Sequence, residues 1–247
     1  MLNTPDHPYS NHANSTLEWE FLGIDTEENF NNRLKKENHP DLIYYQKNPI
    51  EYRLNNYGFR SDDDFFEGDE GNIFLGCSHT FGTGHYIENV WSYLVNKAVG
   101  GKFLNLGVAG SSIATGFRML NYWLDKFEVK NIFIYYPHKY RYEFYNGVHF
   151  TYWPIFNFPK FSKQIQLLHL EEVQAEDHYL SKLYAIYYLA EKKKIPTHVV
   201  FEENIIRREP NPNAKVLLAR DTHLNTGQHY ALYKEMLGMY NKNQKLI

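Results

Sequence analysis

The sequence contains very little cysteine and no long apolar run. Its 247 residues include a single cysteine, Cys77, so no disulfide can form within the chain and a reducing compartment is expected. Apolar residues nowhere approach the run of about 20 that a membrane-spanning helix needs. The first residues also lack the basic segment and apolar stretch of a secretory signal peptide. We therefore expect a cytoplasmic protein without membrane insertion, while association with a virus particle stays open.

Charge of one sign is also scarce in any one part of the chain. Lys and Arg together number 26 and Asp and Glu 29, which gives a formal net charge of −3, and the two signs are interspersed. A basic stripe would indicate a nucleic-acid partner, and a run of like charge would indicate an interaction tail. The chain has neither, so we expect no nucleic-acid partner. The sequence leaves the oligomeric state open.

Aromatic residues, by contrast, are abundant. The chain has 21 Tyr and 17 Phe, and hydrophobic residues make up 43% of it. A chain of this length and composition can bury a substantial core without metals or disulfides. Tyrosine-rich surfaces suit contacts with carbohydrate or protein, because the ring packs while the hydroxyl hydrogen-bonds. Tyrosines at the edge of a wide core explain the composition equally well.

From residue 72 onward, short apolar runs alternate with helical patterns. Strands are predicted at 72–75, 102–106, 131–136, 197–201 and 215–218, and helices at 88–99, 113–127, 179–193 and 227–240. This alternation is typical of a parallel sheet covered by helices on both faces. The predicted fold class is α/β, a three-layer α/β/α sandwich with a flavodoxin-like parallel sheet of about five strands. Functional groups in such folds gather at the carboxyl ends of the strands.

Two segments do not follow this alternation. Residues 1–50 are polar and show little periodicity, and we expect them to form an N-terminal arm or extension packed on a domain of residues 51–247. Residues 138–163 are expected to form a long irregular insertion rich in aromatics. The insertion either walls or covers a binding site, or forms a satellite core under a long loop.

Small or polar residues follow three of the predicted strands. Ser78 comes directly after the first strand, where a serine at the sheet rim has room for a substrate carbonyl. Gly107 and Gly110 follow the second strand, and glycine there allows a sharp turn and an accessible N–H. Asp221 and His223 follow the last strand. Each alone is explained by a turn or a helix cap, but together they favour a serine–histidine pair.

These segments resemble the conserved blocks of the SGNH (GDSL-type) hydrolase family. Gly76-Cys-Ser-His-Thr-Phe-Gly82 is similar to the first block, and Asn105-Leu-Gly-Val-Ala-Gly110 to the second. Asp221-Thr-His223-Leu-Asn-x-Gly is similar to the last block, with one residue between Asp and His. Tyr52-Arg-Leu-Asn-Asn-Tyr-Gly-Phe-Arg60 looks like the lead-in to the first strand. The resemblance covers residues 50–240.

The resemblance implies a serine esterase or acylhydrolase that needs no cofactor. Ser78 would be the nucleophile, His223 the general base, and Asp221 the residue that orients the imidazole. The N–H groups of Ser78 and Gly110 would hold the oxyanion. The enzyme would cleave or transfer an acyl ester, with a small molecule or a glycan ester, such as an O-acetylated glycan, as substrate.

The third block of the family is missing from this chain. In the family, an Asn in a Gly-x-Asn-Asp segment supplies a third oxyanion donor, and losing one such donor typically costs about 10²–10³-fold in turnover. Residues 137–141 read Pro-His-Lys-Tyr-Arg at this place. His138 is the first candidate to replace the Asn, and Arg141 is a candidate to bind an anionic substrate group. Tyr140 and His79 are further candidates for substrate contacts.

The first block departs from the family pattern as well, because Cys77 replaces the usual Asp. A Cys–His pair can catalyse acyl transfer, but a residue directly before the serine is expected to point into the core. Ser78 is therefore the preferred nucleophile. The two departures support an alternative: a catalytically weak or inactive SGNH-like module that binds carbohydrate or protein, or a structural part of a viral or other assembly.

The remaining histidines and glycines match no metal or phosphate motif. His79, His85, His138 and His223 lack the His-x-x-x-His spacing of a helical ligand pair. Residues 76–84 are glycine-rich but lack the Lys of a phosphate-binding loop. We therefore expect no metal and no cofactor.

Overall fold

A parallel sheet lies at the centre of the computed structural model. The structure describes residues 6–19, 31–32, 34–36, 47–136, 141–145, 150–154, 172–201, 224 and 226–244. Within these ranges the sheet has four strands, which are β4 (Lys102–Asn105), β3 (Glu70–Gly76), β5 (Glu128–Tyr135) and β8 (Thr197–Val199), in that spatial order. All neighbouring strands are parallel. The order by sequence is therefore 2-1-3-4, with which flavodoxin-like sheets begin.

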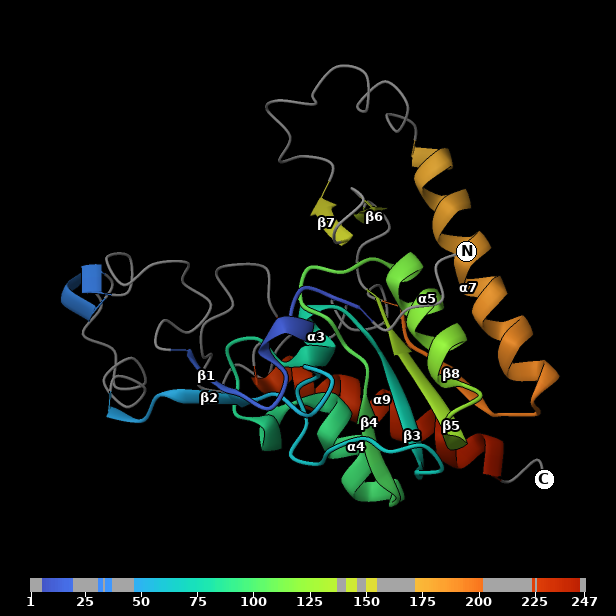
Figure 1. Ribbon diagram of the computed structural model, residues 1–247, viewed down its shortest axis with the longest axis horizontal. Helices are drawn as coiled ribbons and strands as arrows, with labels where there is room; N and C mark the ends of the chain where they lie inside the picture. Colours follow the sequence, from blue (N-terminus) through green and yellow to red (C-terminus); the bar gives the residue numbers. More distant parts are fainter. Residues whose placement is uncertain are drawn as a thin grey trace.

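Helices cover both faces of the sheet, as Figure 1 shows. On one face, α4 (Trp91–Val99) packs beside α9 (Thr226–Gln244). On the other face, α5 (Ile113–Trp123) packs beside α7 (Glu172–Lys192). The α/β class and the arrangement of helix, sheet and helix are thus as predicted. The fifth predicted strand, 215–218, lies outside the described residues.

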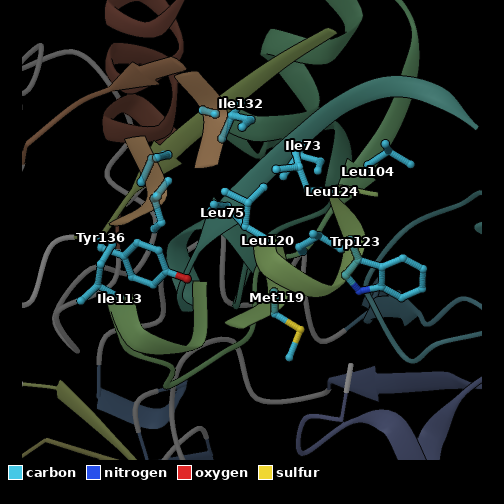
Figure 2. Close-up of a cluster of buried hydrophobic side chains, with 14 of the residues drawn as sticks. Ile73, Leu75, Leu104, Ile113, Met119, Leu120, Trp123, Leu124, Ile132 and Tyr136 are labelled. Carbon is cyan, nitrogen blue, oxygen red and sulfur yellow. The ribbon is translucent and has the colours of Figure 1, made fainter. Parts of the chain in front are cut away.

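The side chains of β3 alternate between two cores. Ile73 and Leu75 are fully buried in the cluster beneath α5 and α7, together with Trp123 (Figure 2). Phe74 points to the opposite face and belongs to the cluster beneath α4 and α9. A strand buried on both faces needs apolar residues at every position, which explains the continuous run Ile73-Phe-Leu75. Burying one such side chain contributes about 1.5–3 kcal/mol.

A row of aromatic rings crosses the sheet on the α4/α9 face. The ring of Phe74 stacks on that of Phe133 with centroids 5.1 Å apart, and Phe103 lies 5.2 Å from Phe74 on the other side. The imidazole of His198 extends the row, stacked 4.8 Å from Phe133. Neighbouring strands thus contribute one ring each, and this row fixes their register in addition to the backbone ladder.

A buried polar chain runs beside this aromatic row. The side-chain amide of Asn131 donates to Asn72 Oδ1 at 2.8 Å, and Asn72 donates in turn to Asn96 Oδ1 of α4 at 3.0 Å. His198 contacts Asn131 Oδ1 through Nε2 at 3.4 Å and Asn243 of α9 through Nδ1 at 3.3 Å. Burial lowers the pKa of His198 to about 4. A neutral imidazole therefore joins the sheet to α9, and the Asn72–Asn96 hydrogen bond joins it to α4.

The N-terminal segment packs on the domain where it is described. β1 (Thr16–Trp19) pairs antiparallel with β2 (Ile50–Arg53), and a short 3₁₀ helix, η1 (Ser10–His12), precedes it. The buried ring of His7 stacks on Phe59 at 4.3 Å, and its Nε2 lies 3.0 Å from the Tyr57 carbonyl. This part of the predicted arm therefore lies against residues 52–60, the segment that precedes β3 in the chain.

The predicted irregular insertion contains regular structure, so that expectation was wrong in part. β6 (Arg141–Tyr145) and β7 (Phe150–Pro154) form an antiparallel pair. The aromatic runs in these strands favour extended backbone, and Asn146-Gly147 between them is a strong hairpin signal. Arg118 of α5 anchors the pair by donating to both carboxylate oxygens of Glu143, at 2.7 and 3.2 Å.

The other predicted elements agree closely with the structure. The helix expected at 88–99 is divided into η2 (Ile87–Asn89) and α4. α7 begins at Glu172 rather than Tyr179, because its first turns are polar and carry no apolar period. Within the described part of the chain, no helix combines the length and apolar character needed to cross a membrane.

The buried imidazole of His198 predicts a loss of stability in acid. Its pKa is about 4 in the folded protein and near 6.5 in the unfolded chain, so the unfolded chain binds protons more readily between these values. The free energy of unfolding should be highest above pH 6.5 and fall as the pH drops from 6.5 towards 4. Urea unfolding at several pH values measures this dependence.

The substitution His198→Gln should weaken this pH dependence by on the order of 1 kcal/mol between pH 7 and 5. His12→Gln, at an exposed histidine, is the matched control. If His198→Gln and the wild type lose stability equally over this range, the assignment of the acid sensitivity to His198 is wrong.

Candidate active site at the end of strand β3

The candidate site lies where the sheet changes winding direction. The helix after β3, α4, covers one face, whereas α5 and α7 cover the other. The chain therefore leaves the carboxyl ends of β3 and β5 towards opposite faces. In open α/β sheets this point leaves a crevice in which ligands bind. Ser78 follows the last residue of β3, Gly76, by two positions and therefore lies at this switch point.

Ser78 is the first residue of the short helix α3 (Ser78–Phe81) and is almost fully buried. Its Oγ lies 3.9 Å from Cys77 Sγ. The helix ends at Gly82, whose left-handed φ of 85° lets the N–H groups of Gly82 and Thr83 both donate to the Ser78 carbonyl, at 2.8 and 2.9 Å. The backbone of the serine is thus fixed in a closed turn.

Cys77 points into the core, as predicted for the residue before the serine. Its side chain is buried in the cluster beneath α5 and α7. It continues the alternation of Ile73 and Leu75 along β3. The side chain therefore packs as an apolar residue, and its position does not favour it as the nucleophile.

Three backbones approach each other at Gly76. Its carbonyl accepts hydrogen bonds from Val108 N at 3.0 Å and from Ser111 Oγ at 3.3 Å, so the second block lies directly against the first. A Cβ on Gly76 would clash with Thr80 Oγ1 and lie 2.6 Å from the Tyr135 carbonyl oxygen. The serine-bearing turn, β5 and the second block can meet here only because residue 76 has no side chain.

Gly110 lies on the same loop and faces open space. Its φ of 77° is in the left-handed region, and no heavy atom would lie within 4 Å of a Cβ built on it. The strained backbone explains why a glycine stands here. The open side leaves room for a bound group next to the loop.

Sequence reasoning missed Arg60, which supports the end of α3 and the loop that follows it. Its guanidinium is buried and donates to the carbonyls of Phe81 at 3.1 Å, Gly82 at 2.5 Å and His85 at 2.6 Å. The guanidinium also stacks on the Tyr52 ring, 4.2 Å from its centroid. Burial lowers the pKa of Arg60 to about 10, so it stays charged at neutral pH. The sequence signal that could have identified Arg60 is its position at the end of residues 52–60, the segment that looks like the family's lead-in to the first strand.

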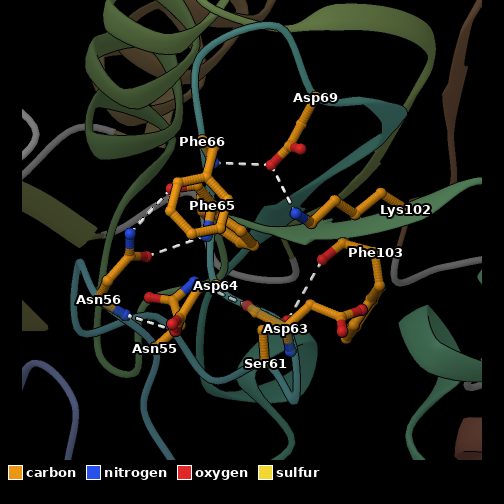
Figure 3. A network of polar contacts seen from close by, with 10 residues as sticks. All are labelled: Asn55, Asn56, Ser61, Asp63, Asp64, Phe65, Phe66, Asp69, Lys102 and Phe103. Atoms are coloured by element: carbon orange, nitrogen blue, oxygen red, sulfur yellow. Dashed lines mark hydrogen bonds and ion pairs between the residues drawn. The ribbon is translucent and has the colours of Figure 1, made fainter.

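A polar network fastens the lead-in itself, as Figure 3 shows. The Asn56 side chain bonds both backbone groups of Phe65, donating to O at 2.8 Å and accepting from N at 2.9 Å. Asp69 forms an ion pair of 2.6 Å with Lys102 of β4. Asn105, at the end of β4, donates to the Arg60 carbonyl at 3.0 Å and accepts from Gly107 N at 3.1 Å.

Buried histidines join the first block to the last. Leu224 N donates to His79 Nδ1 at 3.2 Å, and His85 Nε2 donates to the Leu224 carbonyl at 2.7 Å. The His85 ring packs edge-on against that of His229 with centroids 4.6 Å apart. His229 Nδ1 accepts from the N–H of Trp91, the first residue of α4, at 3.3 Å. His79, expected as a substrate contact, is buried, and its Nδ1 accepts from Leu224 N.

The other predicted site residues are placed only in part. Asp221, His223, His138 and Tyr140 lie outside the described residues. Arg141 is the first residue of β6, and its Nη1 is buried with no hydrogen-bond partner in the part of the chain that the structure describes. A buried guanidinium N–H without an acceptor suits an anionic ligand group.

The end of β5 leads to residues 137–140, where the sequence lacks the expected third-block Asn and which lie outside the described residues. The strand ends at Tyr135, and the next side chain, Tyr136, is buried. The Tyr136 carbonyl accepts a hydrogen bond from Tyr179 of α7 at 3.1 Å. Across the described residues, no group of three or more His, Cys, Asp and Glu side chains is arranged to hold a metal ion.

Comparisons with known proteins add no family assignment. No protein-family model matches the chain, and no curated protein sequence matches it. The resemblance to SGNH hydrolases therefore stays a prediction from three motifs.

The crowding at Gly76 generates a stability prediction. Gly76→Ala should lower the free energy of unfolding by about 2–4 kcal/mol, because the Tyr135 carbonyl belongs to a central strand and cannot move aside. Gly238→Ala is the matched control: it lies in α9 with nothing within 4 Å of its Cβ. The control should gain about 0.5–1 kcal/mol from helix propensity. Denaturant unfolding of both variants tests the close approach, and equal effects would refute it.

Proposed function

We propose that the protein is an SGNH-like serine esterase or acylhydrolase, with Ser78 as its nucleophile. The observation that carries this proposal is the hydrogen bond from Leu224 N to His79 Nδ1. Ser78 directly precedes His79, and His223 directly precedes Leu224. Consecutive Cα atoms lie about 3.8 Å apart. The predicted nucleophile Ser78 and the predicted base His223 are therefore each one residue away, along the chain, from the hydrogen bond that joins their two segments.

The strand order supports the same proposal. Ser78 follows the first strand of a 2-1-3-4 sheet, and the glycine loop of the second block bonds to the residue two before the serine. Both arrangements are expected for a hydrolase of this type, in which loops at the carboxyl ends of neighbouring strands surround one point.

The proposed reaction is acyl transfer in two steps. Ser78 Oγ attacks the ester carbonyl while His223 takes the hydroxyl proton, and His223 returns this proton to the departing alcohol. Water then attacks the acyl-serine with His223 again as base, which releases the acid and restores Ser78. Asp221 would hold His223 in the tautomer that this requires.

The oxyanion would be held by fewer donors than in the family. The N–H groups of Ser78 and Gly110 would be two donors in this scheme, and His138 is the candidate for the third. If nothing replaces the missing Asn, turnover should be lower by about 10²–10³-fold. This departure is the observation that favours the second candidate function, a catalytically silent module that binds carbohydrate or protein.

The surroundings of the site suggest the class of substrate. Aromatic residues of 138–163 suit a sugar or an acyl chain, because rings pack against apolar faces while hydroxyls hydrogen-bond. Arg141 Nη1, which has no hydrogen-bond partner among the described residues, suits an anionic group on that substrate. An acyl ester on a glycan, such as an O-acetyl group, would match the aromatic residues, and no cofactor is needed for its cleavage.

A serine-directed fluorophosphonate and p-nitrophenyl acetate test the proposal. Both should react with the wild type, and Ser78→Ala should abolish labelling and lower kcat by at least about 10³-fold. Ser92→Ala removes another buried serine, whose Oγ donates to the Thr80 carbonyl at 3.1 Å, and should keep its labelling. Absence of labelling together with glycan binding that survives Ser78→Ala would favour the silent module.

A further inference from the structure

Both main-chain polar groups of Leu224 are bound by imidazoles of the serine-bearing segment. His79 accepts from its N–H and His85 donates to its carbonyl. We propose that His79 and His85 are positioning residues that fix the Leu224 peptide, and through it His223, relative to Ser78. The inference rests on the proposed function, in which His223 acts on Ser78.

The two hydrogen bonds require defined tautomers. His79 must carry its proton on Nε2, because Nδ1 accepts from Leu224 N–H. His85 must carry a proton on Nε2, because a carbonyl only accepts. The His229 ring packs against His85, and its own Nδ1 is occupied by the N–H of Trp91. The two hydrogen bonds from His79 and His85 to Leu224, called the clamp below, are thus supported from the first turn of α4.

Burial makes these two bonds hard to replace by water. Leu224 is 6% exposed, and its side chain belongs to the cluster beneath α4 and α9. His79 and His85 are 3% and 5% exposed. If an imidazole is lost, the backbone group that it served stays buried without a partner, and the segment must shift to recover one.

The clamp links the segment that carries Ser78 to the residue next to His223. His79 lies on the same short helix as Ser78, and the His85 backbone is held by Arg60. A displacement of about 1 Å in a catalytic group can cost 10²-fold in rate. A contact that fixes the residue next to His223 therefore controls the rate of proton transfer more than the binding of substrate.

Paired substitutions test the clamp. Asn places an oxygen where Nδ1 of histidine lies, so His79→Asn keeps an acceptor for Leu224 N–H, whereas His79→Leu removes it. Gln places an amide nitrogen near the position of Nε2, so His85→Gln keeps a donor, whereas His85→Leu removes it. His198→Leu is the control, because it removes a buried histidine on the same face of the sheet without a contact to Leu224.

Three readouts are needed: the rate at which the fluorophosphonate labels Ser78, kcat and KM on p-nitrophenyl acetate, and deuterium uptake by peptides covering residues 219–228. The Leu variants should lower kcat and the labelling rate by about 10²-fold, with KM changed less than about threefold. Their 219–228 peptides should exchange faster. His79→Asn and His85→Gln should recover most of the loss, and His198→Leu should lower stability while the folded protein keeps its labelling rate.

The outcomes separate this inference from the proposed function. If the wild type is labelled and the Leu variants match it in rate and exchange, the clamp is refuted and the esterase stands. If the wild type is not labelled, the esterase fails and exchange alone decides: faster uptake in the Leu variants, restored by Asn and Gln, upholds the clamp on Leu224. Unchanged deuterium uptake in the Leu variants would then refute the clamp as well as the esterase.

Discussion

The close approach of three backbones at Gly76 is the constraint on which the rest of the site depends. Its carbonyl receives Val108 N and Ser111 Oγ, while its Cα faces the Tyr135 carbonyl of β5 too closely for any side chain. The serine turn, the second block and the central strand are thereby brought to one point. Every other group of the candidate site is placed relative to this contact, because Ser78 follows Gly76 by two residues.

Arg60 supplies the second constraint, which is electrostatic. A buried guanidinium would be costly without acceptors, and here three backbone carbonyls between residues 81 and 85 receive its N–H groups. The loop after α3 therefore wraps around a cation. This loop carries His85, so the position of the histidine that holds Leu224 follows from the position of Arg60. The charged side chain of Arg60 thus fixes the loop that carries His85, the histidine that contacts Leu224.

The sequence predicted the regular part of the fold well and the supporting contacts poorly. Ile73-Phe-Leu75 is a continuous apolar run, and such runs identify buried parallel strands whatever surrounds them. Arg60 and His79 gave no comparable signal, because their roles come from carbonyls and N–H groups that are distant in sequence and carry no side-chain signature. The β6–β7 pair was missed for another reason: its aromatics were interpreted as the wall or lid of a binding site or as a satellite core under a long loop, although Asn146-Gly147 signals a hairpin.

The two cores of the molecule hold the serine from opposite sides. Cys77 packs into the cluster beneath α5 and α7, whereas His79 bonds Leu224, whose side chain belongs to the cluster beneath α4 and α9. Ser78 stands between them, at the rim where the sheet changes winding direction. An Asp at position 77 would place a carboxylate among the apolar side chains of the α5/α7 core, at a high desolvation cost. The small apolar Cys77 side chain therefore fits the packing at this position and holds the residue before the serine in the core.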